Sequence, residues 1–344
     1  MFLTDDTVAA FAVARHSNLS FPFLKENGEL LSIASTSGML MQPSALRHYE
    51  SFYKRALNIC VLYPQYYRFV LRMVIDLEDL GMNGTTSDDI CALVIDDGLV
   101  DFETSDTRRL ESLYLLRQRR NDVLINDRRS ALLENVDRFI NLPKLFGKLN
   151  KPLCYDLTHL VFFLTEYGKK PWTLSNSIDA CLMNVGVLAL LDNDIDLLSE
   201  VCICLRFLGK QAPQSFLQVI DTELSKVEIS YFNEITSVLN SSTDEYHPYL
   251  VANWLLALEQ KPCFTIKFSG RKPVFTIPQN GASALSAIAS IMHDVFVLNT
   301  KSTQQAKAEL SNLPSQHSKT VDNAIKSYQG ASSLIASYTH GILI

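Results

Sequence analysis

The sequence predicts a mainly α protein, built as a bundle of antiparallel helix hairpins with one small β-hairpin near residues 263–277. Three observations support this fold class. Apolar residues recur at intervals of three and four through most of the 344 residues, which is the spacing of an amphipathic helix. Hydrophobic residues make up 47% of the chain, enough for a sizeable core. Strand-forming residues flank Ser269-Gly270-Arg271-Lys272, as expected of two strands joined by a turn.

The predicted elements follow in chain order. Residues 4–15 are expected to form a short helix that Thr4 caps. Residues 17–42 contain Pro22 and Gly28 and are expected to form a long irregular connection. Further helices are expected at 43–61, 64–80, 86–95, 105–141, 155–166, 175–191, 196–208, 213–240, 245–260 and 281–298.

The order of these elements suggests three consecutive parts. Residues 1–150 form an N-terminal helical layer, residues 151–262 a central bundle with the candidate site, and residues 263–344 the β-hairpin with C-terminal helices. Pro143 and Pro152 bracket a short basic segment that is the best candidate for a boundary. The three parts are also compatible with one large domain.

Composition excludes several classes of function. The net charge of −6 gives no basic footprint for nucleic acid and no attraction to anionic lipid, so neither nucleic acid nor a membrane is an expected partner. The longest apolar runs are too short to span a bilayer, and the N-terminus lacks the pattern of a signal peptide. The seven cysteines are odd in number and lie in apolar patterns, which favours reduced thiols and a cytoplasmic protein.

The most informative stretch is the predicted helix 155–166, because it places ionisable groups on an apolar helix. With His159 at zero on a helical wheel, Glu166 falls about 20° away and Asp156 about 60° to the other side. Phe162 and Phe163 share this sector. Buried charges are costly unless they are paired, so this face should meet partners or a pocket. The competing interpretation is a buried polar network that only orients helices.

A second histidine, His247, begins the predicted helix 245–260 with its ring on the core-facing side. A pocket between the two helices would have a polar wall of Asp156, His159, Glu166 and His247, extended by Asp196 and Glu200. Its apolar, substrate-binding wall would be Phe162, Phe163, Tyr246 and Trp254.

Two roles suit these residues. His159 could be a general base oriented by Asp156 or Glu166. Alternatively, His159, His247 and one carboxylate could bind a divalent metal. Both roles need the two histidines close together in space. The sequence assigns no metal ligands outright and leaves the cofactor open.

Other acidic motifs have simpler explanations. Asp88 and Asp89 fit the first turn of a helix, where the helix dipole favours negative charge. The segment Asp192-Asn193-Asp194-Ile195-Asp196 resembles the first half of an EF-hand loop. It has Leu197 where that loop requires glycine and Ile203 where it requires a bidentate glutamate. We therefore expect a tight turn followed by a helix N-cap.

The helix containing Asp156-Leu157-Thr158-His159 and the later Tyr246-His247 helix together resemble uncharacterised bacterial all-α proteins. Such proteins are similar in outline to α/α toroids, the rings of helical hairpins used by terpenoid cyclases and some glycosidases. The resemblance covers about residues 150–260. Ile195 replaces the last acid of the Asp-x-Asp-Asp signature of class II terpenoid cyclases, so the resemblance implies no catalytic assignment.

The sequence thus supports two classes of function. The first is a bacterial-type helical protein that binds a small molecule or peptide in an interhelical pocket, with histidine and carboxylate acid–base or metal chemistry. The second is a non-catalytic interaction or regulatory protein of solenoid-like build. Assembly into a homo-oligomer is compatible with this class. Its contact surfaces would be the arginine-rich stretch 105–141, the hairpin and the apolar segment 332–344.

Overall fold

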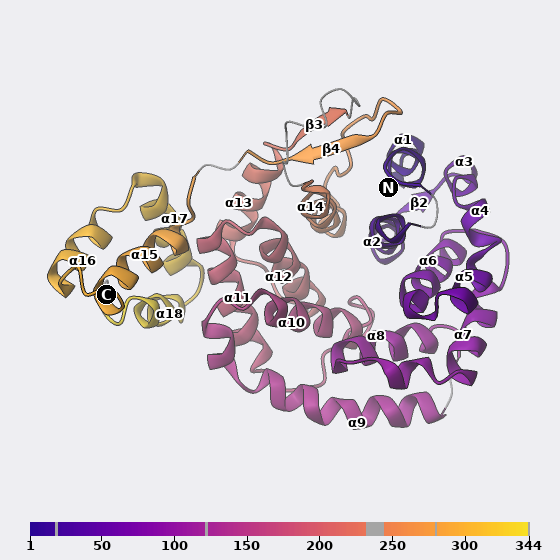
Figure 1. The fold of residues 1–344 in the computed structure, drawn as a ribbon, viewed down its shortest axis with the longest axis horizontal. Helices are drawn as coiled ribbons and strands as arrows, with labels where there is room; N and C mark the ends of the chain where they lie inside the picture. Colours follow the sequence, from indigo (N-terminus) through magenta and orange to yellow (C-terminus); the bar gives the residue numbers. More distant parts are fainter. Residues whose placement is uncertain (18–19, 121–122, 232–243, 279–280, 343–344) are drawn as a thin grey trace. The chain divides into compact units, whose positions relative to one another are not determined.

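The structure is a computed structural model that describes residues 1–17, 20–120, 123–231, 244–278 and 281–342. It confirms the mainly α fold class (Figure 1). The chain forms two compact units: unit 1 comprises residues 1–136 and 227–277, and unit 2 comprises residues 137–226 and 278–344. Each unit therefore combines two separate stretches of sequence, unlike the three consecutive parts expected from the order of elements.

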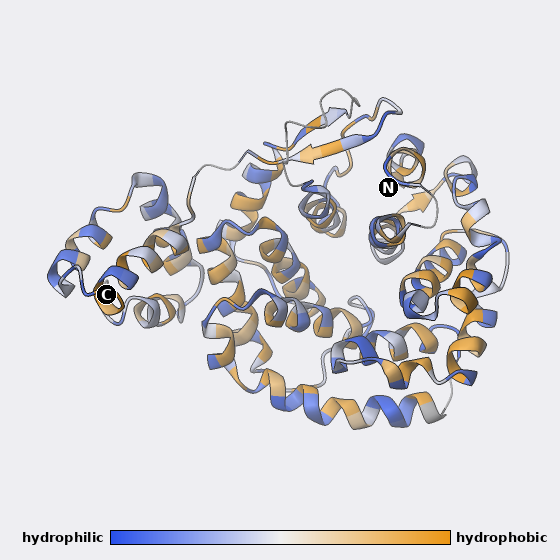
Figure 2. Cartoon of the chain, in the orientation of Figure 1, coloured by the Kyte–Doolittle hydropathy of each residue, from blue (hydrophilic) through white to orange (hydrophobic). Residues whose placement is uncertain are grey.

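Unit 1 consists mainly of short helices around an apolar core. Its helices are α1 (Asp5–Ala9), the π-helix η1 (Ala10–Ala14), α2 (Phe21–Thr36), α3 (Pro43–Arg47), α4 (Glu50–Tyr53), α5 (Ala56–Leu62), η2 (Pro64–Tyr66), α6 (Tyr67–Asp79), α7 (Thr86–Asp96), η3 (Leu99–Phe102), α8 (Asp106–Arg117) and α14 (Tyr246–Leu258). The helix α9 (Val123–Ile140) contains the first boundary between the units. It carries hydrophilic and hydrophobic residues along its length (Figure 2), as expected of an amphipathic helix.

Helix α2 replaces the long irregular connection expected for residues 17–42. The Ser20 hydroxyl caps it by accepting the Phe23 N–H at 3.3 Å, and Pro22 lies in the first turn, where proline is tolerated. Gly28 is buried against α6, and a Cβ built on it would lie 3.6 Å from the Met73 side chain. The residues that suggested a loop are therefore the cap, the first turn and the packed middle of a buried helix.

Two small sheets complete unit 1. Strand β1 (Phe2–Leu3) pairs in parallel with β2 (Leu40–Met41). Strand β4 (Pro273–Thr276) confirms the second strand of the predicted hairpin, but its antiparallel partner is β3 (Glu228–Tyr231) and not residues 263–268. The helix expected at 213–240 was too long, because helix α13 ends at Leu224 and β3 follows; residues 232–240 lie outside the described residues.

Unit 2 surrounds a nearly fully apolar helix, α11 (Ile178–Asp192), which packs against α12 (Ile195–Phe207), η4 (Pro143–Gly147) and α15 (Ala284–Phe296). Its remaining helices are α10 (Lys151–Leu164), α13 (Gln214–Leu224), α16 (Thr303–Ser311), α17 (Ser315–Ser327) and α18 (Ala331–Tyr338). Helices α16 and α17 thus occupy most of the polar stretch 299–330.

The cysteines and the length of the helices bear on two expectations from the sequence. All seven cysteines are thiols and six of them are buried; burial raises the pKa of Cys60 and Cys181 to about 12, so these two thiols are unreactive. Within the described ranges, none of the helices combines the length and the apolar composition needed to cross a membrane.

Candidate functional site

The candidate site is built on α10 and α12, which pack against each other within unit 2. Asn150 is the N-cap of α10, and its side-chain oxygen accepts a hydrogen bond from the Leu153 N–H. Pro152 lies in the first turn of the helix. The apolar side of α10 is buried in the unit. Tyr155, Thr158 and His159 occupy the side that reaches α12.

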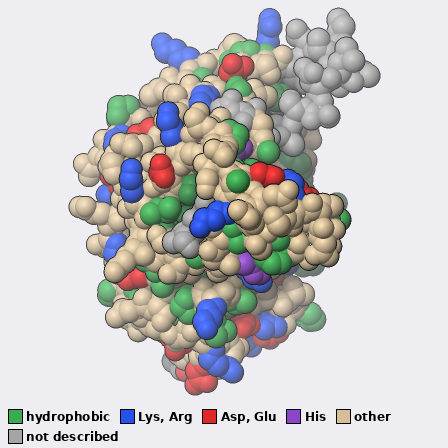
Figure 3. Space-filling model, turned by 90° about the vertical axis from the view of Figure 1, so that its left-hand side faces the viewer, with side chains coloured by type: hydrophobic (Ala, Val, Ile, Leu, Met, Phe, Trp, Pro, Cys, Tyr) green, Lys and Arg blue, Asp and Glu red, His purple; other side chains and the backbone are tan. Residues whose placement is uncertain are grey.

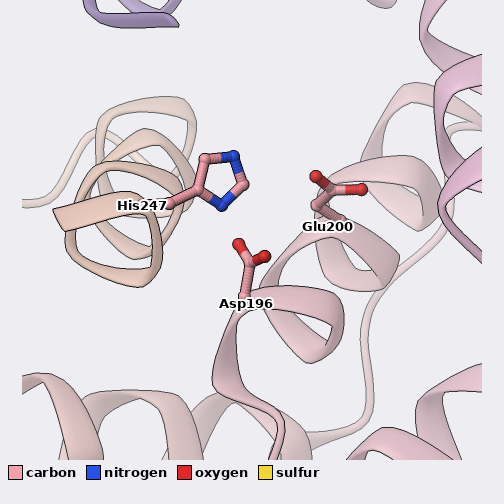
Figure 4. Close-up of side chains that lie close together, drawn as sticks. All are labelled: Asp196, Glu200 and His247. Carbon is pink, nitrogen blue, oxygen red and sulfur yellow. The ribbon is translucent and has the colours of Figure 1, made fainter. Parts of the chain in front are cut away.

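Helix α12 begins after a turn in which Asn193 has a left-handed conformation, with φ of 57°. The Asp194 carboxylate caps the helix by accepting the Leu197 N–H at 3.1 Å. Asp196 and Glu200 then stand on consecutive turns of α12 (Figure 4). A carboxylate oxygen of Asp196 lies within 4.8 Å of one of Glu200.

Hydroxyl groups of α10 hold both carboxylates. The Tyr155 hydroxyl donates to Asp196 Oδ2 at 2.7 Å, and the Thr158 hydroxyl donates to Glu200 Oε2. His159 Nε2 lies 3.9 Å from Glu200 Oε1. The Glu200 side chain is only 4% exposed, whereas the His159 side chain is 44% exposed. A solvent-accessible imidazole therefore lies beside a buried, hydrogen-bonded carboxylate.

Burial and the nearby carboxylates determine the protonation of the neighbouring groups. Burial, reinforced by the negative charge of Asp196, raises the pKa of the Tyr155 phenol far above its ordinary value. Tyr155 is therefore a permanent hydrogen-bond donor to Asp196. Burial and the charge of Glu200 also raise the pKa of the Cys204 thiol, which excludes it as a nucleophile at neutral pH.

Among the predicted catalytic residues on α10, His159 lies at the cluster and Glu166 does not lie on the helix at all. Helix α10 ends at Leu164, and Glu166 follows in a left-handed turn with φ of 48°. Its carboxylate binds the Lys170 ammonium at 2.8 Å. The helical wheel was therefore wrong for this residue. Asp156 is half-buried on α10.

The two predicted substrate-binding phenylalanines pack beside the imidazole. The ring centroids of Phe162 and Phe163 lie 6.0 and 6.1 Å from that of His159. Both side chains are buried, and Phe162 also stacks on Tyr167 at 5.8 Å. Their contacts are those of core aromatic residues that support the position of His159.

The remaining predicted site residues belong to α14 of unit 1, where Figure 4 also draws His247. Within that unit, His247 Nε2 lies 3.6 Å from Glu29 Oε1 on α2. The Tyr246 ring lies 5.1 Å from the Arg15 guanidinium, and Trp254 is a buried core residue. The expected proximity of His247 and His159 stays a prediction.

Sequence reasoning missed a buried ion-pair network in unit 1. The Arg15 guanidinium, fully buried, donates to both carboxylate oxygens of Glu26 at 2.5 and 2.9 Å. It also donates to Asp244 Oδ2 and to the Pro273 carbonyl, each at 2.6 Å. These partners raise the pKa of Arg15 and lower that of Glu26 against the effect of burial. The network joins η1, α2 and β4, so its evident role is structural.

The acidic turn before α12 confirms the interpretation as a turn with a helix cap. The Lys151 ammonium lies 3.2 Å from Asp192 Oδ2 and 2.8 Å from Asp194 Oδ2. A lysine of the chain itself thus supplies the positive charge that a calcium ion would bring to an EF-hand loop.

The arginine-rich stretch forms ion pairs along the helices of unit 1. Arg119 donates to Asp79 at 2.7 Å, and Arg109 pairs with Asp106 at 3.1 Å. Figure 3 shows basic, acidic and apolar side chains interspersed on the face that it displays.

Comparison with known proteins yields one match. The family model described as Domain of unknown function (DUF6902) matches residues 3–340. Comparisons with curated proteins and with solved structures find no match, so the expected resemblance to α/α toroids is not shown.

Proposed function

The chain belongs to the DUF6902 family, and we propose, from the geometry of α10 and α12, that it is a divalent-cation-binding protein whose cation binds a small-molecule or peptide ligand. Asp196 and Glu200 are the proposed protein ligands. The observation that supports this proposal is the separation of their carboxylate oxygens, within 4.8 Å of each other on one side of α12.

This separation suits one shared ion. Two oxygens bound to a cation at about 2.0–2.6 Å each lie at most about 5 Å apart. A small side-chain rotation therefore brings both oxygens within reach of the same ion. A cation would also stabilise the negative charge of Glu200, whose side chain is only 4% exposed and accepts a hydrogen bond from Thr158.

The exposed His159 ring gives the proposed site its chemistry. His159 Nε2 lies 3.9 Å from Glu200 Oε1, so the proposed role of its ring is to exchange a proton with a ligand bound at the cation. His247 belongs to unit 1, and the role predicted for it from the sequence stays a prediction.

Calorimetric titration with Zn²⁺ and Mn²⁺ tests the proposal, together with metal analysis of the purified protein. We expect D196N and E200Q each to lower the affinity on the order of 100-fold or more, because loss of a ligand should cost at least as much as loss of a supporting residue. D89N is the matched control, since Asp89 is an exposed helix carboxylate with no proposed role.

Titration of H159A and H247A separately identifies the imidazole that contributes. A loss of affinity in one variant assigns that histidine as a ligand. Wild-type protein that binds neither ion, or affinities in D196N and E200Q equal to that of D89N, would refute the proposed cation site.

A second candidate function is self-association, which a run of exposed apolar residues at the end of α15 favours. Phe296, Val297 and Leu298 expose 48%, 63% and 54% of their surface. If this run binds a second copy of the chain, V297S/L298S should convert an oligomer to a monomer in light scattering. A monomeric wild-type protein at high concentration excludes this candidate.

A further inference from the structure

We infer that the Tyr155 and Thr158 hydroxyls determine which cation the site accepts, favouring Zn²⁺ over Ca²⁺. This inference rests on the proposed function, since it concerns the specificity of the same site. Tyr155 and Thr158 contribute through the carboxylates that they hold and not by touching the ion, so they are positioning residues.

The argument begins with the oxygens that the hydroxyls bind. Tyr155 donates to Asp196 Oδ2, and Thr158 donates to Glu200 Oε2. A carboxylate that turns one oxygen to a hydroxyl on the neighbouring helix presents the other oxygen, Oδ1 or Oε1, to an ion. Both carboxylates are therefore expected to coordinate through one oxygen only.

Coordination through single oxygens discriminates between cations. Ca²⁺ takes six to eight oxygen ligands and commonly uses both oxygens of a carboxylate. Zn²⁺ takes about four nitrogen and oxygen ligands and accepts carboxylates through one oxygen. Two carboxylates that each offer one oxygen suit Zn²⁺, which needs few ligands, and leave Ca²⁺ short of ligands.

The hydroxyls are held firmly enough to enforce this arrangement. Thr158 is fully buried in α10, and α10 packs directly on α12. Rotating either carboxylate to present both oxygens would break its hydrogen bond to the hydroxyl on α10.

The test compares Zn²⁺ and Ca²⁺ affinities by calorimetry in wild type, Y155F and T158V. Both substitutions remove a hydroxyl and keep the size of the side chain. We expect each to reduce the preference for Zn²⁺ over Ca²⁺ by about tenfold or more, within the range known for residues that support metal ligands. T158S keeps the hydroxyl and should retain the wild-type preference, and Y167F is the control for an aromatic ring on the same part of unit 2.

Cobalt spectra provide a second readout that a change in stability alone would not alter. Co²⁺ in the wild-type site should give the intense visible bands of a four-coordinate ion, and Y155F and T158V should weaken them by raising the coordination number. Unchanged ion preference and spectra in Y155F and T158V, with D196N still abolishing binding, would overturn this inference and leave the proposed function standing. Absence of any binding by wild type would overturn both.

Discussion

Replacing Asp76 by asparagine should change how the stability of unit 1 depends on pH. Asp76 is buried on α6, where its Oδ2 accepts a hydrogen bond from the Ser32 hydroxyl of α2 at 2.6 Å. Arg72 donates to the same hydroxyl at 3.3 Å. Burial outweighs the attraction of Arg72 and raises the pKa of the Asp76 carboxyl from 3.8 to about 6.

The sign of the effect follows from the direction of this shift. The folded protein holds the proton at pH values where the unfolded chain has lost it. Asp76 therefore contributes stability that is fully present below about pH 4 and is lost as the pH rises through about 6. The full loss amounts to about 3 kcal/mol, of which about 1.4 kcal/mol falls between pH 5 and pH 7.5.

D76N removes this titration and keeps an oxygen that can accept the Ser32 hydrogen bond. The free energy of unfolding of D76N relative to wild type should therefore rise by about 1.4 kcal/mol from pH 5 to pH 7.5. Urea unfolding in a W172F background measures it, because Trp254 in unit 1 is then the only tryptophan reporter. D89N, at an exposed position of unit 1, is the control. A difference between D76N and wild type that is independent of pH would refute the reasoning.

Two further predictions concern packing and buried charge. G28A should stabilise the protein by up to about 1 kcal/mol, since a Cβ at this helical position meets only ordinary van der Waals contact. G186A should destabilise the protein by about 1–3 kcal/mol, because its Cβ would lie 2.5 Å from the Phe216 ring. Equal midpoints of thermal unfolding for the two variants would contradict this pair of predictions. R15M should cost about 3–5 kcal/mol in urea unfolding, since Glu26 would keep a buried charge without its main partner, and R15M/E26Q should recover part of that loss.

Several features of this protein were predictable from the sequence because they depend on neighbouring residues. Apolar periodicity predicted the mainly α fold class, and the turn signals around Asn193 and Asp194 predicted the start of α12. The spacing of Asp196 and Glu200 placed both carboxylates one turn apart, and the apolar surroundings of His159 marked α10 as unusual. Each of these predictions needs only the geometry of a single helix or turn.

Two predictions were wrong because tertiary packing overrode the local signals on which they rested. Gly28 and Pro22 suggested a loop, yet α2 is a helix because its burial against α6 outweighs their low helix propensity. Glu166 continued the helical pattern in sequence, but the chain leaves the helix at Leu164 and turns through a left-handed conformation. Helix ends are among the least predictable features, because ending a helix in a cap and turn and extending it by one more residue differ little in free energy.

Only the tertiary structure decided the pairings over long sequence separations. Strand β4 pairs with Glu228–Tyr231, the guanidinium of Arg15 meets Asp244, and the hydroxyls of Tyr155 and Thr158 reach carboxylates of α12 about 40 residues later. Sequence determines which residues share a helix face, because that depends on backbone geometry alone. Which faces meet depends on the packing and desolvation of the whole unit, so the hydroxyl–carboxylate contacts of the candidate site emerged only from the folded chain.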